Sequence, residues 1–236
     1  MVHNNQSLTS WEVRQSAKET VSILKNNKVK CCLFGSLACH IQGMKYRRPG
    51  DVDLVILNHG KRNAEYFKEL VASSDSDRFY LEKSTNPKAK YKKLFYRVTP
   101  YQGRDPSKVY KIDILIAGQD YPLQIPNVPV SCIQYSKQYP GLPLMPLLPL
   151  LLMKLQGWYD HRSSWRKDQV EKQRRDITDI GKLLKMAKNE ECHLDEEIKG
   201  IWRLPKWFTN RMRRFVGEYI EHFPDTEEDW NSLGFE

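Results

Sequence analysis

The sequence has no hydrophobic run that is long enough to span a membrane. Its longest apolar stretch, residues 142–153, contains three prolines. The chain also opens without the basic and then apolar pattern of a secretion signal. We therefore expect a soluble, cytoplasmic protein. With 236 residues, of which 40% are hydrophobic, the chain can build a core without disulfides.

The cysteines do not show the spacing of a zinc site. They are odd in number, and three of them lie in or beside apolar runs, which predicts reduced thiols in the core of an intracellular protein. The five are Cys31, Cys32, Cys39, Cys132 and Cys192. Internal repeats and long low-complexity tracts are also missing from the sequence.

Basic residues are missing from the end of the chain. Residues 225–236 carry five acidic residues and neither lysine nor arginine. Because the whole chain has a formal charge of +9, the remainder carries +14. Such a charge favours polyanionic partners, either nucleic acid or a nucleoside triphosphate, although solubility alone is an equal alternative.

Asp51 and Asp53 open an apolar run at residues 51–57 that is typical of a strand. One residue separates them, so both carboxylates point to the same side of that strand. Two carboxylates this close repel each other unless a cation lies between them. Mg²⁺ is the commonest hard cation with a preference for such oxygen ligands, so the pair predicts a magnesium site.

Gly35 and Ser36 precede this pair, in the turn between a predicted strand at 28–34 and a predicted helix at 37–43. The turn offers backbone N–H groups and a hydroxyl to an anion such as phosphate. A metal pair beside a phosphate-binding turn favours phosphoryl or nucleotidyl transfer.

Asp113 interrupts the apolar strand predicted at residues 109–117. A carboxylate in such a strand is costly to bury unless it is paired or binds a metal. We interpret Asp113 as a third metal ligand. The alternative is an acid at the sheet edge or one that faces solvent.

The first half of the chain predicts an α/β (α+β) fold with a mixed sheet and flanking helices, and the last part predicts an all-helical domain. Seven of the 13 prolines fall in residues 118–149, which excludes long helices there and leaves one edge strand at 128–133. The predicted helices are 9–26, 37–43, 61–73, 147–158, 165–188, 194–202 and 205–222, and the strands are 28–34, 51–57, 78–81, 90–99 and 109–117. The expected domains are a catalytic domain at 1–118, a connector at 119–146, a helical domain at 147–224 and an acidic tail at 225–236.

The residues from Phe34 to Leu54 resemble the signature of the polymerase-beta-type nucleotidyltransferase superfamily. That signature has an apolar strand, Gly-Ser, a short helix, and then Asp-apolar-Asp-apolar, with a third acid on a later strand. The fourteen residues between Ser36 and Asp51 make a slightly longer loop than this family usually has. The resemblance implies that Asp51, Asp53 and Asp113 bind two Mg²⁺ ions, and that Gly35 and Ser36 bind the phosphates of an NTP.

The C-terminal half resembles the toxin-like nucleotidyltransferases of abortive-infection (type IV) systems. The similarity lies in a helix lysine, Lys154, in Arg162, and in the run Arg-Asp-Ile-Thr-Asp-Ile at residues 175–180. It implies that Lys154 faces the triphosphate and that Asp176 is needed for activity, with Asp168 as an alternative for that second role. The alternatives are a lysine that reaches solvent and an ordinary solvated helix face. From the residues alone, Asp176 and Asp179 lie on one helix face and could hold Lys154 in position.

Arg47 lies four residues before Asp51, where toxin-like relatives often carry an arginine, but Pro49 stands where they commonly have Thr or Ser. Arg47 could therefore neutralise phosphate charge, or it could belong to a solvated loop. Aromatic and basic residues also alternate along 202–219. The aromatic residues could stack on bases while the basic residues bind phosphates. The alternative is an amphipathic helix, with the aromatic residues on its core face and the basic residues in solvent.

These features predict a Mg²⁺-dependent nucleotidyltransferase that moves an NMP from an NTP to a hydroxyl acceptor. The positive charge favours RNA or tRNA as that acceptor. One alternative is a small, antibiotic-type acceptor. The others are a catalytically inactive module that binds nucleotide or RNA, and an RNA-binding protein that uses only its C-terminal helices.

Overall fold

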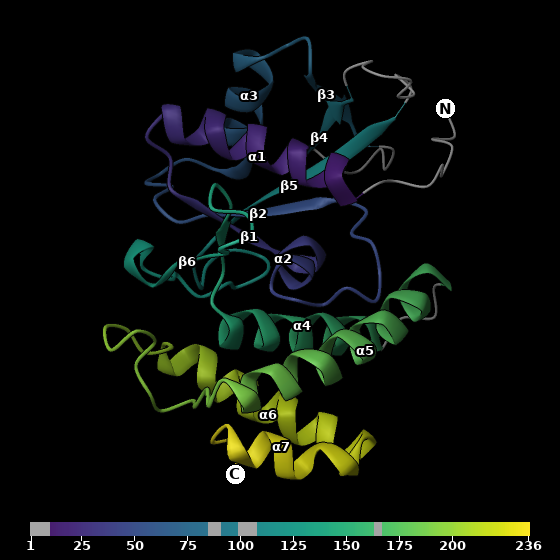
Figure 1. The fold of residues 1–236 in the computed structure, drawn as a ribbon, viewed down its shortest axis with the longest axis vertical. Helices are drawn as coiled ribbons and strands as arrows, with labels where there is room; N and C mark the ends of the chain where they lie inside the picture. The colour runs from purple at the N-terminus through teal and green to yellow at the C-terminus, as the bar shows by residue number, and fades with distance from the viewer. Residues whose placement is uncertain (1–9, 85–90, 99–107, 163–166) are drawn as a thin grey trace. The chain divides into compact units, whose positions relative to one another are not determined.

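The structure, a computed structural model, describes residues 10–84, 91–98, 108–162 and 167–236. The chain divides into two compact units (Figure 1). Unit 1 contains the residues up to Ala117 together with Ile133–Leu144, and unit 2 contains Gly118–Cys132 and Met145–Glu236. The proline-rich segment therefore contributes to both units.

Unit 1 is built on one mixed sheet with the strand order β3-β4-β5-β2-β1-β7-β6. β2 pairs with β5 in parallel and β1 pairs with β7 in parallel, whereas the other neighbours are antiparallel. The strands are β1 (Cys31–Phe34), β2 (Val52–Ile56), β3 (Phe79–Lys83), β4 (Lys92–Arg97), β5 (Val109–Ile116), β6 (Gln134–Tyr135) and β7 (Pro143–Leu144).

Three helices accompany this sheet: α1 (Ser10–Asn26), α2 (Gly35–Ile41) and α3 (Ala64–Ser74). α1 and α3 contact each other and both pack on β5, while α2 packs on β1 and β2. The apolar positions that recur at helical spacing in α1 are all buried, which confirms the predicted amphipathic helix. They are Val13, Ala17, Val21 and Leu24.

The two faces of β5 have different environments. Its residues alternate between buried and half-exposed along the whole strand. On the buried face, the Tyr110 hydroxyl donates to a carboxylate oxygen of Glu12 on α1 at 2.7 Å. Lys111 and Asp113 therefore belong to the face of the sheet that is turned away from α1.

The edge strand predicted at 128–133 is wrong. Val130–Cys132 forms a 3₁₀ helix, in which the Cys132 amide donates to the Pro129 carbonyl at 2.9 Å. Proline favours the start of such a turn and cannot donate in a strand. Pairing begins only afterwards, where Gln134 of β6 lies opposite Leu144 of β7.

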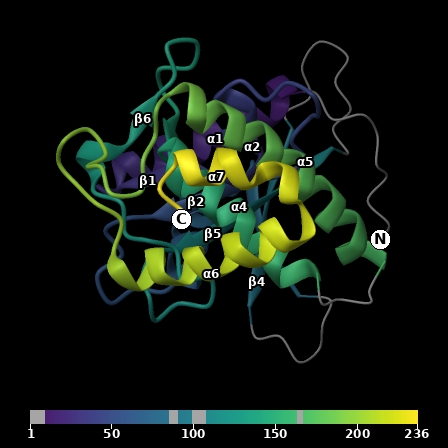
Figure 2. The same cartoon turned by 90° about the horizontal axis from the view of Figure 1, so that it is seen from below.

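Unit 2 is helical, and α4 packs against α5 and α6 while α5 contacts α7 (Figure 2). Its core includes Trp158, Tyr219 and Trp230, each at most 2% exposed. Phe208 and Phe215 are also buried, so these aromatic side chains form a core face and are not free to stack bases. The helices are α4 (Leu147–Arg162), α5 (Lys167–Asn189), α6 (Lys206–His222) and α7 (Glu227–Ser232).

The short helix predicted at 194–202 is also wrong. Lys199 and Gly200 have φ angles of +55° and +63°, which a right-handed helix does not allow. Ile198 instead forms an isolated antiparallel bridge with Trp202. Among the described residues, no helix combines the length and the apolar composition that a membrane span requires.

The described cysteines carry no disulfide, as predicted. Four of them are buried, and Cys192 is half-exposed. Burial raises the pKa of Cys31 to about 12, so this thiol stays protonated and unreactive at neutral pH.

Candidate active site

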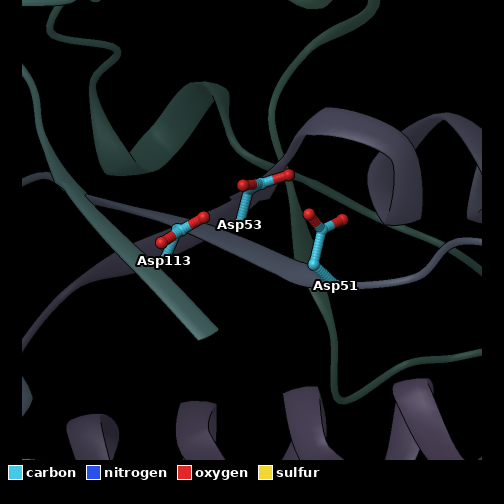
Figure 3. A group of neighbouring side chains, drawn as sticks. All are labelled: Asp51, Asp53 and Asp113. Atoms are coloured by element: carbon cyan, nitrogen blue, oxygen red, sulfur yellow. The ribbon is translucent and has the colours of Figure 1, made fainter. Parts of the chain in front are cut away.

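Asp51, Asp53 and Asp113 converge on one face of the unit 1 sheet (Figure 3). Asp53 and Asp113 are register partners on the parallel strands β2 and β5, and Asp51 lies two residues before Asp53. Each carboxylate offers one oxygen atom, and these three atoms lie within 4.8 Å of one another. The side chains are half-exposed, so the group is open to a ligand.

This arrangement suits a divalent cation. Three carboxylates at this distance repel one another in water, and a cation that they share removes the repulsion. Carboxylate oxygens are also the ligands that Mg²⁺ prefers, and Mg²⁺ keeps several of its own waters when it binds an accessible site of this kind.

The Gly35-Ser36 bend lies directly beside the three carboxylates. Phe34 is the register partner of Asp53, so the next residue, Gly35, sits against the Asp53 side chain. Gly35 has a φ of +62°, and a Cβ added there would overlap Oδ2 of Asp53 and lie 2.8 Å from its Cγ. Ser36 donates its hydroxyl to Oδ1 of Asp51 at 3.4 Å. The bend and the acids therefore form one compact group of side chains.

Lys111 is a charged member of this group that the sequence reasoning missed. Its ammonium lies 2.5 Å from Oδ2 of Asp113. Burial lowers the pKa of Lys111, but attraction to Asp113, and then to Asp51 and Asp53, outweighs this and raises the pKa above the usual lysine value. The signal was present in the sequence, because residues 111 and 113 are two apart on a strand and share a face.

Arg47 lies in the loop between α2 and β2. It is half-exposed, and its Nε donates to the Tyr46 hydroxyl at 3.2 Å. Its guanidinium also lies 5.9 Å from the centre of the Tyr46 ring. A role for Arg47 in neutralising phosphate charge stays a prediction.

Lys154 and Asp176 contact each other within unit 2. The Lys154 ammonium lies 3.5 Å from a carboxylate oxygen of Asp176 and 2.8 Å from one of Asp179. The other carboxylate oxygen of Asp176 lies 2.8 Å from Nδ1 of His161. The Asp179 side chain is fully buried and that of Lys154 is 13% exposed. The two aspartates therefore hold Lys154 in a buried ionic network, and the alternative of a solvated helix face is wrong.

We expect Lys154→Met to lower the free energy of unfolding by about 2 kcal/mol, because it leaves two buried carboxylates without their cation. Denaturant unfolding of the purified variant measures this change. Lys185→Met, which removes an exposed lysine on α5, is the matched control and should change stability by less than about 0.5 kcal/mol. Equal stability of the two variants would contradict the network.

Arg162 follows Lys154 two turns later on α4. It forms an ion pair with Glu218 and stacks over the Tyr159 ring at 4.2 Å. Arg162 therefore ties α4 to α6 and does not share the carboxylates of Lys154. The side chain of Asp168 lies outside the part of the chain that the structure describes.

Comparison with known proteins identifies the family of the chain. A family model described as "Nucleotidyl transferase AbiEii toxin, Type IV TA system" matches residues 36–229. No curated protein matches the chain.

Solved structures resemble the fold. An antigenic nucleotidyltransferase-like protein from Paracoccidioides brasiliensis is 17% identical with a TM-score of 0.64, over 95% of this chain and 94% of that chain. JHP933 from Helicobacter pylori is 17% identical with a TM-score of 0.49, over 94% and 82% of the two chains. The antibiotic-resistance factor ANT(2'')-Ia is 10% identical with a TM-score of 0.39, over 76% and 94%. The family match spans most of the chain, so this protein belongs to the AbiEii family of nucleotidyl transferases and is a nucleotidyltransferase.

Proposed function

We propose that this protein transfers an NMP from an NTP to a hydroxyl group of RNA, with tRNA as the first candidate acceptor, and that the reaction requires Mg²⁺. The observation that carries the proposal is the convergence of Asp51, Asp53 and Asp113 beside the Gly35-Ser36 bend. Family membership supports nucleotidyl transfer, and the carboxylates support the metal.

The residues of unit 1 have distinct roles in this proposal. Asp51 and Asp53 would hold two Mg²⁺ ions, and Asp113 would complete the set of ligands on the acceptor side. When bound, the ions supply positive charge that lowers the pKa of the acceptor hydroxyl and stabilises the leaving pyrophosphate. Gly35 and Ser36 would bind the outer phosphates through backbone N–H groups and the Ser36 hydroxyl.

Three further residues complete the assignment. From the family resemblance, Lys154 would face the triphosphate. Asp176 would act as a positioning residue, because its carboxylate contacts the Lys154 ammonium. Arg47 would neutralise phosphate charge from the loop before Asp51. A charge that is already in place stabilises the transition state without reorganisation during the reaction.

The choice of RNA is supported by a basic cluster in unit 1, which we define as Arg14, Lys45 and Tyr139. The Arg14 guanidinium lies 4.8 Å and the Lys45 ammonium 6.0 Å from the centre of the Tyr139 ring. Burial lowers the pKa of the neighbouring His40, and the charges of Lys45 and Arg14 lower it further, so His40 is not counted among these cations. Cations around an aromatic ring can bind a phosphate backbone and a base together.

The direct test uses each α-labelled NTP with Mg²⁺ and either total RNA or a panel of small hydroxylated acceptors. We expect label in the RNA fraction, and its loss when EDTA removes the metal. Label in small acceptors alone would reject RNA as the substrate. No transfer, together with NTP binding that ignores Mg²⁺ in calorimetry, would favour an inactive nucleotide-binding module.

We expect the double variant Arg14→Ala/Lys45→Ala to weaken RNA binding by about tenfold and to reduce the slope of log affinity against log salt by about one to two, because it removes up to two phosphate contacts. Titration of labelled RNA at several salt concentrations measures both quantities. The control is Lys25→Ala/Lys28→Ala, which removes the same charge from exposed positions near the other end of α1. An equal loss in the control would contradict a specific role for the basic cluster. RNA binding that depends on neither pair would point to the C-terminal helices.

A further inference from the structure

The Lys111 ammonium lies beside the group of three carboxylates that could hold a metal ion. It contacts Asp113 at 2.5 Å, and Asp113 in turn has an oxygen within 4.8 Å of oxygens of both Asp51 and Asp53. The register of β2 and β5 pairs Val52 with Ile112 and Asp53 with Asp113, and the charges of Asp51 and Asp53 also attract the Lys111 ammonium. Lys111 is therefore adjacent to carboxylates on its own strand and on the neighbouring one.

Charge explains why a lysine is held there. Three carboxylates on one face of a sheet repel each other, and a single ammonium removes part of that repulsion without any ligand. The pair is only partly shielded, since the side chains of Lys111 and Asp113 are 41% and 30% exposed. A lysine carries its charge on a flexible four-carbon stem, so the ammonium can leave the carboxylate while the backbone of β5 stays in place.

We propose that Lys111 is an internal counter-ion that competes with the divalent metal for Asp113 and must move away before the metal binds. This inference rests on the proposed metal site and adds a residue to it. Lys111 is a positioning residue here, since it acts through Asp113 on the metal ligands.

The competition has a consequence for the order of binding. A metal that arrives alone must displace the ammonium, which then loses its carboxylate partner. A triphosphate that arrives with the metal offers the displaced ammonium a new anionic partner in the same place. Metal and NTP therefore bind cooperatively, and each raises the affinity for the other by the same factor.

The test measures metal affinity without nucleotide and without turnover. Mn²⁺ is titrated into the full-length protein and its free fraction is followed by electron paramagnetic resonance. We expect Lys111→Met to bind Mn²⁺ alone about tenfold more tightly than the wild type, because the competing cation is gone. Lys111→Arg, which keeps a cation at this position, should retain the weak affinity of the wild type.

Lys18→Met is the matched control, because it removes an exposed lysine from α1, which packs on the opposite face of β5. Its Mn²⁺ affinity should equal that of the wild type. A second readout is thermal: Mn²⁺ should raise the melting temperature of Lys111→Met more than that of the wild type.

Two results would overturn the proposal. One rejects only the role of Lys111, and the other also rejects the proposed metal-dependent function. If Lys111→Met and the wild type bind Mn²⁺ equally, and Asp53→Asn abolishes binding, the metal site stands but Lys111 does not compete for it. If neither protein binds Mn²⁺ at millimolar concentration, the proposed Mg²⁺-dependent function fails together with this inference.

Discussion

Replacing Asp51 or Asp53 by asparagine is expected to lower the transfer of labelled NMP by about 10³-fold or more, equivalent to about 4 kcal/mol of lost transition-state stabilisation. Asparagine keeps the size of the side chain but removes the charge that a divalent cation needs. The loss should persist at saturating NTP, because it concerns the reaction step and not only binding.

The same variants show whether a loss of transfer comes from the reaction step or from a loss of folded protein. Since the three carboxylates repel one another in the metal-free protein, removing one charge should leave the melting temperature unchanged or raise it. The matched control is Asp77→Asn, which neutralises an exposed carboxylate in the turn between α3 and β3 and should leave transfer unchanged. Full transfer by both Asp51→Asn and Asp53→Asn would show that the assigned site is wrong.

The second large effect is expected at Gly35, where Gly35→Ala should reduce transfer by about 10²-fold. An alanine Cβ would overlap the Asp53 carboxylate, so either the Asp53 side chain or the Gly35-Ser36 bend must move. Displacement of a reacting group by about 1 Å is enough for a loss of this size. Transfer assays at several NTP concentrations measure it.

Gly60→Ala is the control for backbone strain. Gly60 has a φ of +61°, nearly equal to the +62° of Gly35, but a Cβ there would meet nothing within 4 Å. Both variants should lose about 1 kcal/mol of stability from the left-handed conformation. Only Gly35→Ala should lose transfer, and an equal loss of transfer in Gly60→Ala would attribute the effect to strain.

Much of the site follows from local rules of strand geometry. The spacing of Asp51 and Asp53 predicted their common side, and the burial that alternates along β5 places Asp113 on the face turned away from α1. Local rules cannot predict the register that places Asp53 beside Asp113, because it depends on parallel pairing between segments that are distant in the sequence. The resemblance to a known signature supplied that contact where periodicity could not.

The errors have a common physical origin in residues that bend the backbone. At 128–133 the proline-rich segment was expected to hold an edge strand, but the turn after Pro129 prevents the extended conformation. At 194–202 the helical pattern fails because Lys199 and Gly200 adopt positive φ angles. Lys111 was missed for another reason: only the acid of this strand was considered, although Lys111 lies two residues before Asp113 on the same face.

The parallel pairing of β2 with β5 also determines when the proposed metal site can form. The three acids come from segments about sixty residues apart, so a growing polypeptide that has not yet produced β5 holds two of them and lacks the third. Long-range pairing of this kind forms later than local hairpins and helices. The proposed metal site therefore cannot form in a nascent chain until ribosomal synthesis has passed residue 113 and the two strands have met.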